Sequence, residues 1–466
     1  MTVRKGRKEM NLHFVGIGGI GMSGIAQVFV NQGYEVSGSD IADSDSSKKL
    51  ARMGVKFHLG HRAENVRDAD VVVVSSAVRA DNPEVVEARR RRIPVIRRAE
   101  MLGELMRGRH GIAVAGTHGK TTTTSMMATV MTAAGWDPTL VIGGKVDSLG
   151  GNAKLGQGNY VVAEADESDG SFLHLPATHA IVTNIDNDHL DHYGSLEAID
   201  EAFVNFVGQL PFYGLVALCA EDPGVRRNLS RFTKPFVTYG FSGDWDYVAT
   251  EVREEAFGSK FRVRHCRNGV LGEISLHVPG RHNVLNALAV VAVCLDLGMP
   301  FAQVADGLAQ YRGVKRRFEV RWRDEATSRA IVDDYGHHPT EIEATLAAAR
   351  QFWKKRIIVV FQPHRYSRTL HCRDGFLHAF RGADVVLLTD IYAAGEAPID
   401  GVDSASLAEA MRRVAPQGQR IEAVGGLDAA RDEVVKLMAP GDLILCMGAG
   451  TITRLPDSLM DAITGK

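Results

Sequence analysis

Short apolar runs alternate along the whole chain with longer amphipathic stretches, and each apolar run has the length of a buried β-strand. Runs of this kind, separated by helix-like stretches, predict an α/β fold with mainly parallel sheets. The predicted strands are Leu12–Val15, Tyr34–Ser37, Val71–Val74, Gly111–Ala115, Tyr160–Ala163, Ala180–Thr183, Ala330–Val332, Ile357–Phe361, Val385–Leu388 and Leu443–Met447. The stretch from Asp244 to Val278 alternates apolar and polar residues instead, and it predicts a small antiparallel sheet.

Glycine loops after two of the predicted strands, and a polar segment before a later one, divide the chain into three α/β blocks. The blocks are residues 1–108, 109–315 and 316–466. A chain of 466 residues has room for two to four domains of about 100–200 residues each. We therefore expect three domains, with boundaries near residues 108 and 315.

Composition and charge narrow the class of protein. The 54 Lys and Arg residues and 56 Asp and Glu residues leave a net charge of −2, so no basic excess indicates nucleic-acid binding. No apolar run reaches the roughly 18 residues of a membrane-spanning helix. The five cysteines are dispersed and have no zinc-ligand spacing, which is typical of reduced thiols in a cytoplasmic enzyme.

The loop Gly116-Thr-His-Gly-Lys-Thr121 lies between a predicted strand and a predicted helix. Its small residues let backbone N–H groups approach phosphate oxygens at the start of the helix. Lys120 can place a positive charge on the β- and γ-phosphates, and the Thr121 hydroxyl can bind Mg²⁺. The loop is shorter than the eight-residue phosphate-loop pattern, because Val114 stands where that pattern requires glycine. The alternative is therefore a glycine turn with a solvated lysine.

Polar clusters follow the next two strands of the same block. Glu164 opens the sequence Glu-Ala-Asp-Glu-Ser-Asp after one strand, and His189 closes Asn-Ile-Asp-Asn-Asp-His after the other. Carboxyl ends of parallel strands meet at the ligand-binding edge of a sheet, and Mg²⁺ prefers oxygen ligands. We expect a metal site there, although an acidic loop alone is usually solvated and a lone histidine is usually structural.

The first block holds a second glycine loop, Gly16-Ile-Gly-Gly-Ile-Gly21, which matches the dinucleotide-binding pattern. Asp40 ends the second strand, 24 residues after Gly16, where such an acid holds a ribose in nicotinamide enzymes. Ser75 and Ser76 follow a later strand and can add hydroxyl donors at the same edge. The loop therefore predicts a nucleotide diphosphate without identifying the base, and a tight structural turn is the alternative.

Together these features resemble the Mur ligases of bacterial cell-wall synthesis, over roughly residues 11 to 452. The motifs are Gly16-Ile-Gly-Gly-Ile-Gly-Met-Ser-Gly24, Gly116-Thr-His-Gly-Lys-Thr-Thr-Thr-Thr124, Glu164-Ala-Asp-Glu-Ser-Asp-Gly170, Gly280-Arg-His-Asn-Val-Leu-Asn286, Asp333-Asp-Tyr-Gly-His-His-Pro339 and Gln362-Pro-His-Arg-Tyr-Ser-Arg368. Within the family the resemblance is closest to the branch that adds L-alanine to UDP-N-acetylmuramate. It implies a Rossmann-like UDP-sugar-binding domain, a P-loop ATPase-like central domain and a Rossmann-like C-terminal domain for the amino acid.

The resemblance also implies roles for individual residues. ATP is expected at Gly116, Thr117, His118, Gly119, Lys120, Thr121, Thr122, His282, Asn283, Asn286 and Arg317. Mg²⁺ is expected at Thr121, Glu164 and His189. The two other substrates are expected at Gly18, Gly19, Ile20, Gly21, Asp40, Ser75, Ser76, His189, Tyr335, His337, Arg365 and Arg368. Other Mur ligases use a carbamylated lysine as a metal ligand, and this sequence has no obvious counterpart.

Amide formation from a carboxylate needs activation, which ATP supplies by forming an acyl phosphate. Phosphoryl transfer depends mainly on positioning and charge neutralisation, so Lys120 is the expected catalytic cation. His337 or Asp334 can accept the proton of the attacking amine. Arg365, with Arg368, can hold the acyl phosphate or the amino-acid carboxylate. Asp334 ordering a strand end, and His337 only binding substrate, are the alternatives.

Three other functions fit part of the pattern. One is a related ligase whose acceptor is a peptide or another amino acid. A nicotinamide-dependent oxidoreductase would use the first glycine loop but leaves Lys120 unexplained. A non-catalytic nucleotide-binding regulator would leave His337 and Arg365 without a role. The sequence does not decide among alanine, glycine and serine as acceptor, and we expect a monomer or weak homodimer without membrane insertion.

Overall fold

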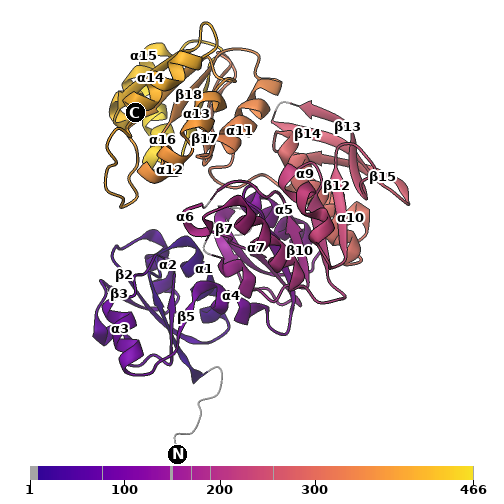
Figure 1. Ribbon diagram of the computed structural model, residues 1–466, viewed down its shortest axis with the longest axis vertical. Helices are drawn as coiled ribbons and strands as arrows, with labels where there is room; N and C mark the ends of the chain where they lie inside the picture. The colour runs from indigo at the N-terminus through magenta and orange to yellow at the C-terminus, as the bar shows by residue number, and fades with distance from the viewer. Residues whose placement is uncertain are drawn as a thin grey trace, which may run out of the picture. The chain divides into compact units, whose positions relative to one another are not determined.

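The computed structural model describes residues 9–75, 77–146, 151–168, 170–188, 190–255 and 257–464. These residues form three β-sheets with helices packed against them (Figure 1), which confirms the predicted α/β architecture. The chain divides into two compact units. The first holds the first sheet and most of the second, and the other holds the third sheet with residues 252–260 and 276–284. None of the described helices is long and apolar enough to span a bilayer.

The first sheet consists of five parallel strands in the order β3-β2-β1-β4-β5. The strands are β1 (Asn11–Val15), β2 (Glu35–Asp40), β3 (Lys56–Leu59), β4 (Val71–Val74) and β5 (Val95–Arg97). Its helices are α1 (Ile20–Asn31), α2 (Asp45–Arg52), the 3₁₀ helix η2 (Ala63–Val66), α3 (Pro83–Arg90) and α4 (Arg98–Met106). The strand order reverses between β1 and β4, and sheets of this kind bind ligands at the carboxyl ends of the strands flanking such a reversal.

A buried polar network ties α3 to the first sheet. The Glu84 carboxylate accepts hydrogen bonds from Ser39 Oγ at 2.6 Å and Asn65 Nδ2 at 2.6 Å, and lies 3.1 Å from His61 Nδ1. His13 Nε2 lies 3.6 Å from the same carboxylate, and both side chains are fully buried. Burial by itself raises the pKa of Glu84, but its interactions with His13, Ser39 and Asn65 outweigh that effect and lower the pKa to about 2.

Substitution of Glu84 with alanine is expected to lower the free energy of unfolding by about 3–5 kcal/mol, because it leaves buried partners without their anion. The folded pKa lies below the unfolded value, so the stabilisation is present above about pH 4.5 and is lost as the pH falls toward 2. Urea unfolding should therefore show that the free energy of unfolding falls more steeply with decreasing pH for the wild type than for Glu84→Gln. Glu64 is an exposed glutamate of η2 in the same domain, and Glu64→Ala is the matched control variant. Equal stability of the two alanine variants would contradict this account.

The second sheet has ten strands in the order β15-β14-β13-β12-β11-β10-β6-β9-β7-β8. The strands are β6 (His110–Ala115), β7 (Thr139–Val146), β8 (Gly151–Lys154), β9 (Tyr160–Glu164), β10 (His179–Val182), β11 (Leu215–Cys219), β12 (Phe236–Gly240), β13 (Tyr247–Glu255), β14 (Gly258–His265) and β15 (Gly269–Leu276). Its helices are α5 (Lys120–Ala133), η4 (Ser171–His174), α6 (Leu190–Tyr193), α7 (Leu196–Gly208), α8 (Pro223–Asn228), η5 (Leu229–Arg231), α9 (Arg281–Asp296) and α10 (Phe301–Gln310). β6 pairs in parallel with both β9 and β10, so the loops after these three strands emerge at one edge.

The stretch from Asp244 to Val278 does not form the separate small sheet that its alternating pattern predicts. β13 instead pairs in parallel with β12 through Tyr239 and Tyr247, so β13–β15 extend the ten-stranded sheet. This pairing joins residues that are close in sequence, and the apolar–polar pattern alone does not reveal it.

The third sheet has six strands in the order β16-β17-β21-β18-β19-β20. The strands are β16 (Glu319–Asp324), β17 (Arg329–Asp334), β18 (Ile357–Phe361), β19 (Val385–Thr389), β20 (Arg420–Gly425) and β21 (Leu443–Met447). Its helices are α11 (Pro339–Phe352), α12 (Tyr366–His371), α13 (Arg373–Ala379), α14 (Ser404–Val414), α15 (Leu427–Leu437), η6 (Thr451–Arg454) and α16 (Leu455–Thr464). All neighbouring strands are parallel except β16 and β17, and separate apolar clusters cover the two faces.

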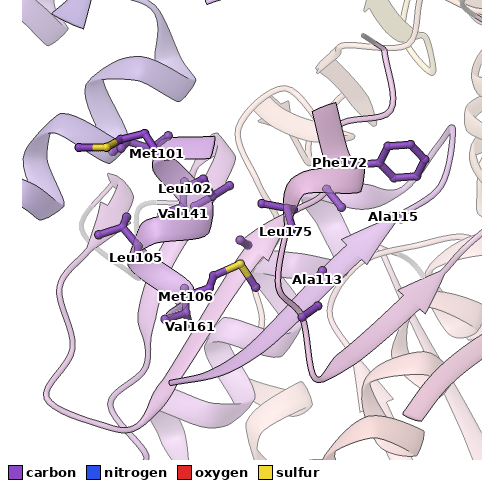
Figure 2. Close-up of a cluster of buried hydrophobic side chains, with 14 of the residues drawn as sticks. Met101, Leu102, Leu105, Met106, Ala113, Ala115, Val141, Val161, Phe172 and Leu175 are labelled. Atoms are coloured by element: carbon purple, nitrogen blue, oxygen red, sulfur yellow. The ribbon is translucent and has the colours of Figure 1, made fainter. Parts of the chain in front are cut away.

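Helix α4 packs its apolar side chains onto the elements of the second sheet (Figure 2). The residues of α4 in this cluster are Met101, Leu102, Leu105 and Met106, and other members of the cluster include Ala113, Val141, Val161, Phe172 and Leu175. Gly103 permits the close approach, because a Cβ there would lie 3.0 Å from the carbonyl oxygen of His174. Burial of this much apolar surface holds the start of α4 beside the edge where β6 and β9 end.

Candidate active site

The loop between β6 and α5 is shaped for close backbone approach. Gly116 and Gly119 have φ angles of +128° and +84°, in the region that favours glycine. A Cβ at Gly116 would lie 2.0 Å from Thr183 Oγ1, so a larger residue does not fit. The N-terminus of the 14-residue helix α5 follows at once. The loop thus presents backbone N–H groups and a helix dipole to an anion.

Lys120 lies over this loop and is mostly buried. Its Nζ donates to the carbonyl oxygens of Gly116 at 2.7 Å and Thr117 at 3.1 Å, and to Glu167 Oε1 at 2.8 Å. Burial alone would lower the pKa of Lys120, but the carboxylates of Glu167, Asp166 and Glu164 raise it above its ordinary value. The ammonium group therefore stays charged where phosphates would approach.

Glu164 lies at the end of β9 and faces the start of α5. Its Oε2 accepts from Thr121 Oγ1 at 3.2 Å, and its Oε1 accepts from the backbone N–H of Gly143 at 2.7 Å. A hydroxyl and a carboxylate oxygen held side by side are the kind of ligands that Mg²⁺ takes while keeping several waters. The structure thus brings together two of the three predicted metal ligands. The third, His189, lies outside the described residues.

The loop after β10 fastens the phosphate loop from the other side. Asn184 Oδ1 accepts from the backbone N–H of His118 at 2.7 Å, and Thr183 Oγ1 donates to the carbonyl oxygen of His118 at 2.6 Å. His118 Nε2 lies 3.1 Å from Asp186 Oδ2, and the Asp186 backbone N–H donates to Thr117 Oγ1 at 2.9 Å. Predicted nucleotide contacts His118 and Thr117 therefore also hold the loop in shape.

Helix α9 brings a further polar side chain to the phosphate loop. Asn286 is buried, and its Oδ1 lies 3.1 Å from where a Cβ of Gly119 would be. Asn283, one turn earlier, is also buried and donates through Nδ2 to the carbonyl oxygen of Pro279 at 2.7 Å. His282 packs against Gly280. Asn286 is thus placed beside the loop, while Asn283 holds the start of its own helix.

The first glycine loop, after β1, is closed by Asp40 from the end of β2. Asp40 Oδ2 accepts from the backbone N–H of Gly18 at 2.8 Å, and a Cβ at Gly18 would lie 2.9 Å from that oxygen. Ser75 lies near Gly16, and α1 begins at Ile20. The structure therefore gathers Asp40, Ser75 and the loop at the β1–β4 switch point. Ser76 lies outside the described residues.

In the other unit, Asp334 ends β17 and is buried with its oxygens occupied. Oδ2 accepts from the backbone N–H of Phe318 at 2.8 Å, and Oδ1 accepts from the N–H of Gly336 at 2.8 Å and from Thr345 Oγ1 at 3.3 Å. Burial raises the pKa of Asp334, and the neighbouring Arg317 only partly offsets that effect. These bonds order the loop before α11.

Tyr335 and His337 follow in that loop, against two arginines and Glu341. The guanidinium carbons of Arg316 and Arg317 lie 4.9 and 5.0 Å from the centre of the Tyr335 ring. Arg317 Nη1 lies 3.2 Å from Glu341 Oε1. His337 Nδ1 lies 3.1 Å from the carbonyl oxygen of Tyr335 and 3.2 Å from Glu341 Oε2. Glu341 thus orients both Arg317 and His337.

Arg365 lies at the start of α12, after β18, with a φ of +68° that non-glycine residues rarely adopt. Its Nε donates to Glu396 Oε1 at 2.5 Å, and Arg368 Nη1 lies 3.5 Å from His364 Nδ1. The His364 ring lies 5.8 Å from that of His337. Burial, followed by the charges of His337 and the two arginines, lowers the pKa of His364 to about 4. The predicted residues Tyr335, His337, Arg365 and Arg368 thus gather at the carboxyl ends of β17 and β18.

Family models match the chain in three consecutive segments. They are the Mur ligase family, catalytic domain, over residues 11–110; the Mur ligase middle domain, over residues 114–294; and the Mur ligase, glutamate ligase domain, over residues 316–450. These segments cover most of the chain in family order. The chain belongs to the Mur ligase family.

Relatives of this Mur ligase match it along almost its full length. It is 56% identical over 456 residues to the UDP-N-acetylmuramate–L-alanine ligase of Geobacter sulfurreducens, and the match covers 97% of each chain. It is 51% identical over 463 residues to the enzyme of the same name from Myxococcus xanthus, covering 98% of this chain and 96% of that one. The predicted resemblance to Mur ligases is therefore confirmed.

Solved structures agree with the three-domain fold. The crystal structure of the UDP-N-acetylmuramate–alanine ligase MurC from Thermotoga maritima superposes with a TM-score of 0.83 at 33% identity, covering 98% of this chain and 100% of that chain. A murein peptide ligase from Psychrobacter arcticus superposes with a TM-score of 0.70 at 26% identity, covering 98% and 99%. The predicted three-domain α/β architecture of this Mur ligase is confirmed.

Several residues of these sites were not predicted. Glu167 holds Lys120, Asp186 holds His118, Glu341 holds His337 and Glu396 holds Arg365. All four are carboxylates that position a predicted cation or imidazole. Glu167 and Asp186 lie inside the predicted polar clusters that follow two strands, but Glu396 lies 31 residues from Arg365 with no local signal.

Proposed function

We propose that this Mur ligase joins L-alanine to the carboxylate of UDP-N-acetylmuramate and converts ATP to ADP and phosphate, as a cytoplasmic step of peptidoglycan precursor synthesis. The observation that carries the proposal is the likeness, over 97% of this chain, to a relative named for that reaction. The two glycine loops supply a physical basis, because one suits a triphosphate and the other a nucleotide diphosphate. We also propose domain boundaries near residues 108 and 315.

The proposed reaction has two covalent steps. A carboxylate oxygen of UDP-N-acetylmuramate attacks the γ-phosphorus of ATP, and the bond to the β–γ bridging oxygen breaks to release ADP. The alanine nitrogen then attacks the acyl carbon, and the carbon–oxygen bond to phosphate breaks. Negative charge develops on oxygen in both steps, and Lys120, whose raised pKa keeps it cationic, lies where it would neutralise that charge.

The residues around Thr121 and Glu164 suit a Mg²⁺ ion. Both offer oxygen ligands, the two oxygens lie 3.2 Å apart, and Asp166 adds negative charge two residues after Glu164. We propose that the Thr121 hydroxyl and the Glu164 carboxylate hold this ion, with His189 as a further ligand. The ion would neutralise phosphate charge when bound. Gly143 keeps Glu164 in place by donating its backbone N–H.

We propose His337 rather than Asp334 as the group that accepts the amine proton. Both Asp334 oxygens accept backbone hydrogen bonds, so that carboxylate is already engaged. His337 Nδ1 lies within hydrogen-bond distance of the Tyr335 carbonyl oxygen and Glu341, which favours a proton on Nδ1 and leaves Nε2 as the basic nitrogen. Arg365 and Arg368 would hold an anionic group of the substrates.

Replacement of His337 with glutamine is therefore expected to lower kcat by about a hundredfold or more. Without a base, only alanine that is already deprotonated reacts, so the kcat of the variant should rise steeply between about pH 7 and 9.5 relative to the wild type. Steady-state kinetics at saturating ATP across that range measure the effect. His371→Gln changes an exposed histidine of α12 and is the matched control. Parallel pH profiles for His337→Gln and the wild type would refute the role.

The function itself is tested by incubating the purified protein with ATP, Mg²⁺, UDP-N-acetylmuramate and L-alanine, and then omitting each in turn. ADP release and a product heavier by one alanine residue, only in the complete mixture, are the expected results. Glycine, L-serine and a short peptide replace alanine in parallel reactions. Product with the peptide but not with any amino acid would assign the related peptide-ligase function. ATP binding without product from any acceptor would indicate a regulator.

A further inference from the structure

Arg98 is the first residue of α4 and lies between the first glycine loop and the acidic loop after β9. Its Nη2 donates to Asp166 Oδ2 at 2.8 Å, in the acidic loop after β9. Its Nη1 lies only 2.5 Å from where a Cβ of Gly21 would be, so the guanidinium covers the start of α1. One side chain thus contacts both the nucleotide-diphosphate loop and the loop that holds Lys120.

The position of Arg98 is fixed from two sides. The apolar residues of α4 are buried against the second sheet, which holds the helix to the central domain (Figure 2). Asp166 then orients the guanidinium by accepting a hydrogen bond from Nη2 at 2.8 Å. A planar guanidinium that is held by one carboxylate keeps its other N–H groups directed, and Arg98 remains 28% exposed for a ligand.

The surroundings of Arg98 suit an anion. A cavity of about 370 Å³ at the carboxyl ends of β4 and β5 is lined by Ser75, Arg79, Arg89, Arg97, Arg98 and His192, among others. Arg79 is paired with Asp81 at 3.0 Å and Arg98 with Asp166 at 2.8 Å, so Arg89 and Arg97 supply the further positive charge of the cavity lining. Negatively charged ligands are concentrated in clefts lined by positive charge.

We propose that Arg98 is a positioning residue for the UDP-linked substrate, donating through Nη1 to a diphosphate oxygen held over Gly21 while Nη2 stays on Asp166. The inference rests on the proposed function for the identity of that substrate. It adds a physical link between the two substrates, because Asp166 and Glu167 are neighbours and Glu167 holds Lys120. Arg98 would thereby align the sugar nucleotide with the phosphate loop of the central domain.

Calorimetric binding to the full-length protein tests the contact directly. UDP has the nucleoside diphosphate without a sugar substituent. UDP-N-acetylglucosamine adds the sugar without the acid, and UDP-N-acetylmuramate adds the sugar with its carboxylate. Arg98→Ala is expected to weaken binding of all three by about 10–100-fold, the usual loss for a hydrogen bond to a charged group. Binding of ATP alone should change less than about twofold. Arg90→Ala, on the exposed side of α3, should bind all ligands as the wild type does.

Kinetics separate positioning from a structural effect. Arg98→Ala should raise the KM for UDP-N-acetylmuramate at least tenfold while leaving the KM for L-alanine unchanged, and Arg98→Lys should recover part of the loss. Asp166→Asn should lower kcat with a smaller change in UDP affinity, because it releases the orientation of Arg98 but not its charge. Circular dichroism and thermal unfolding of Arg98→Lys test whether this variant is folded.

Wild-type affinity of both Arg98 variants for UDP would overturn the proposal. Weakened binding of UDP-N-acetylmuramate alone, with UDP unchanged, would also overturn it, because the guanidinium would then contact the sugar acid. Failure of the proposed function is distinguishable. A wild-type protein that binds UDP through Arg98 but forms no amide would refute the ligase assignment and still support the diphosphate contact.

Discussion

Substitution of Lys120 with alanine is expected to lower kcat by about 100- to 1,000-fold while the protein stays folded. Lys120 is a buried cation held over the phosphate loop by Gly116, Thr117 and Glu167. Removal of one preorganised donor at a site of developing negative charge costs about 3–4 kcal/mol of transition-state stabilisation. ADP release under saturating substrates measures the loss.

The fold should tolerate this change because its buried partner can become neutral. Burial raises the pKa of Glu167 to about 7, despite the opposing effect of Lys120, so this carboxyl can take up a proton once the lysine is gone. Lys154→Ala removes a half-exposed lysine that pairs with Asp137 in the same domain, and should keep wild-type turnover. A folded Lys120→Ala protein with more than a tenth of wild-type turnover would refute the assigned role.

Replacement of Glu164 with glutamine is the second change with a large expected effect. Glu164 is the carboxylate beside Thr121, so the substitution removes the negative charge that we propose binds Mg²⁺ while keeping the shape of the side chain. We expect kcat to fall at least a hundredfold and the Mg²⁺ concentration for half-maximal activity to rise at least tenfold.

Titration of activity with Mg²⁺ at fixed ATP distinguishes metal binding from a packing effect. Glu201→Gln, which changes an exposed glutamate of α7 in the same domain, is the control and should follow the wild-type curve. If the Glu164→Gln curve has the wild-type midpoint and only a lower plateau, Glu164 does not hold the metal ion.

Much of the fold is predictable from the sequence because parallel strands that are buried on both faces consist of unbroken apolar runs. The runs at Ile357–Phe361 and Leu443–Met447 are strands with those same limits. β16 was missed, since it lies at the edge of its sheet, is half-exposed and carries charged residues at several positions. The parallel pairing of β13 with β12 joins residues close in sequence, but the apolar–polar periodicity does not indicate which strand β13 pairs with.

The site was predictable where one short segment supplies the chemistry, as in the two glycine loops. Partners distant in sequence were not. Arg98 and Asp166 are 68 residues apart and belong to different domains, and Glu396 meets Arg365 only after the third sheet forms. Asp40, predicted as a substrate contact, accepts a hydrogen bond from the backbone N–H of Gly18 and thereby shapes the glycine loop.

The central claim is that ATP activates the sugar-acid carboxylate by phosphorylating it. UDP-N-acetylmuramate labelled with ¹⁸O in its carboxylate tests this directly, by mass spectrometry of the products formed with ATP and L-alanine. The account predicts one ¹⁸O atom in the released inorganic phosphate for each amide formed, with the other oxygen retained in the product. Amide formation with ¹⁸O in AMP, or with unlabelled phosphate, would contradict it.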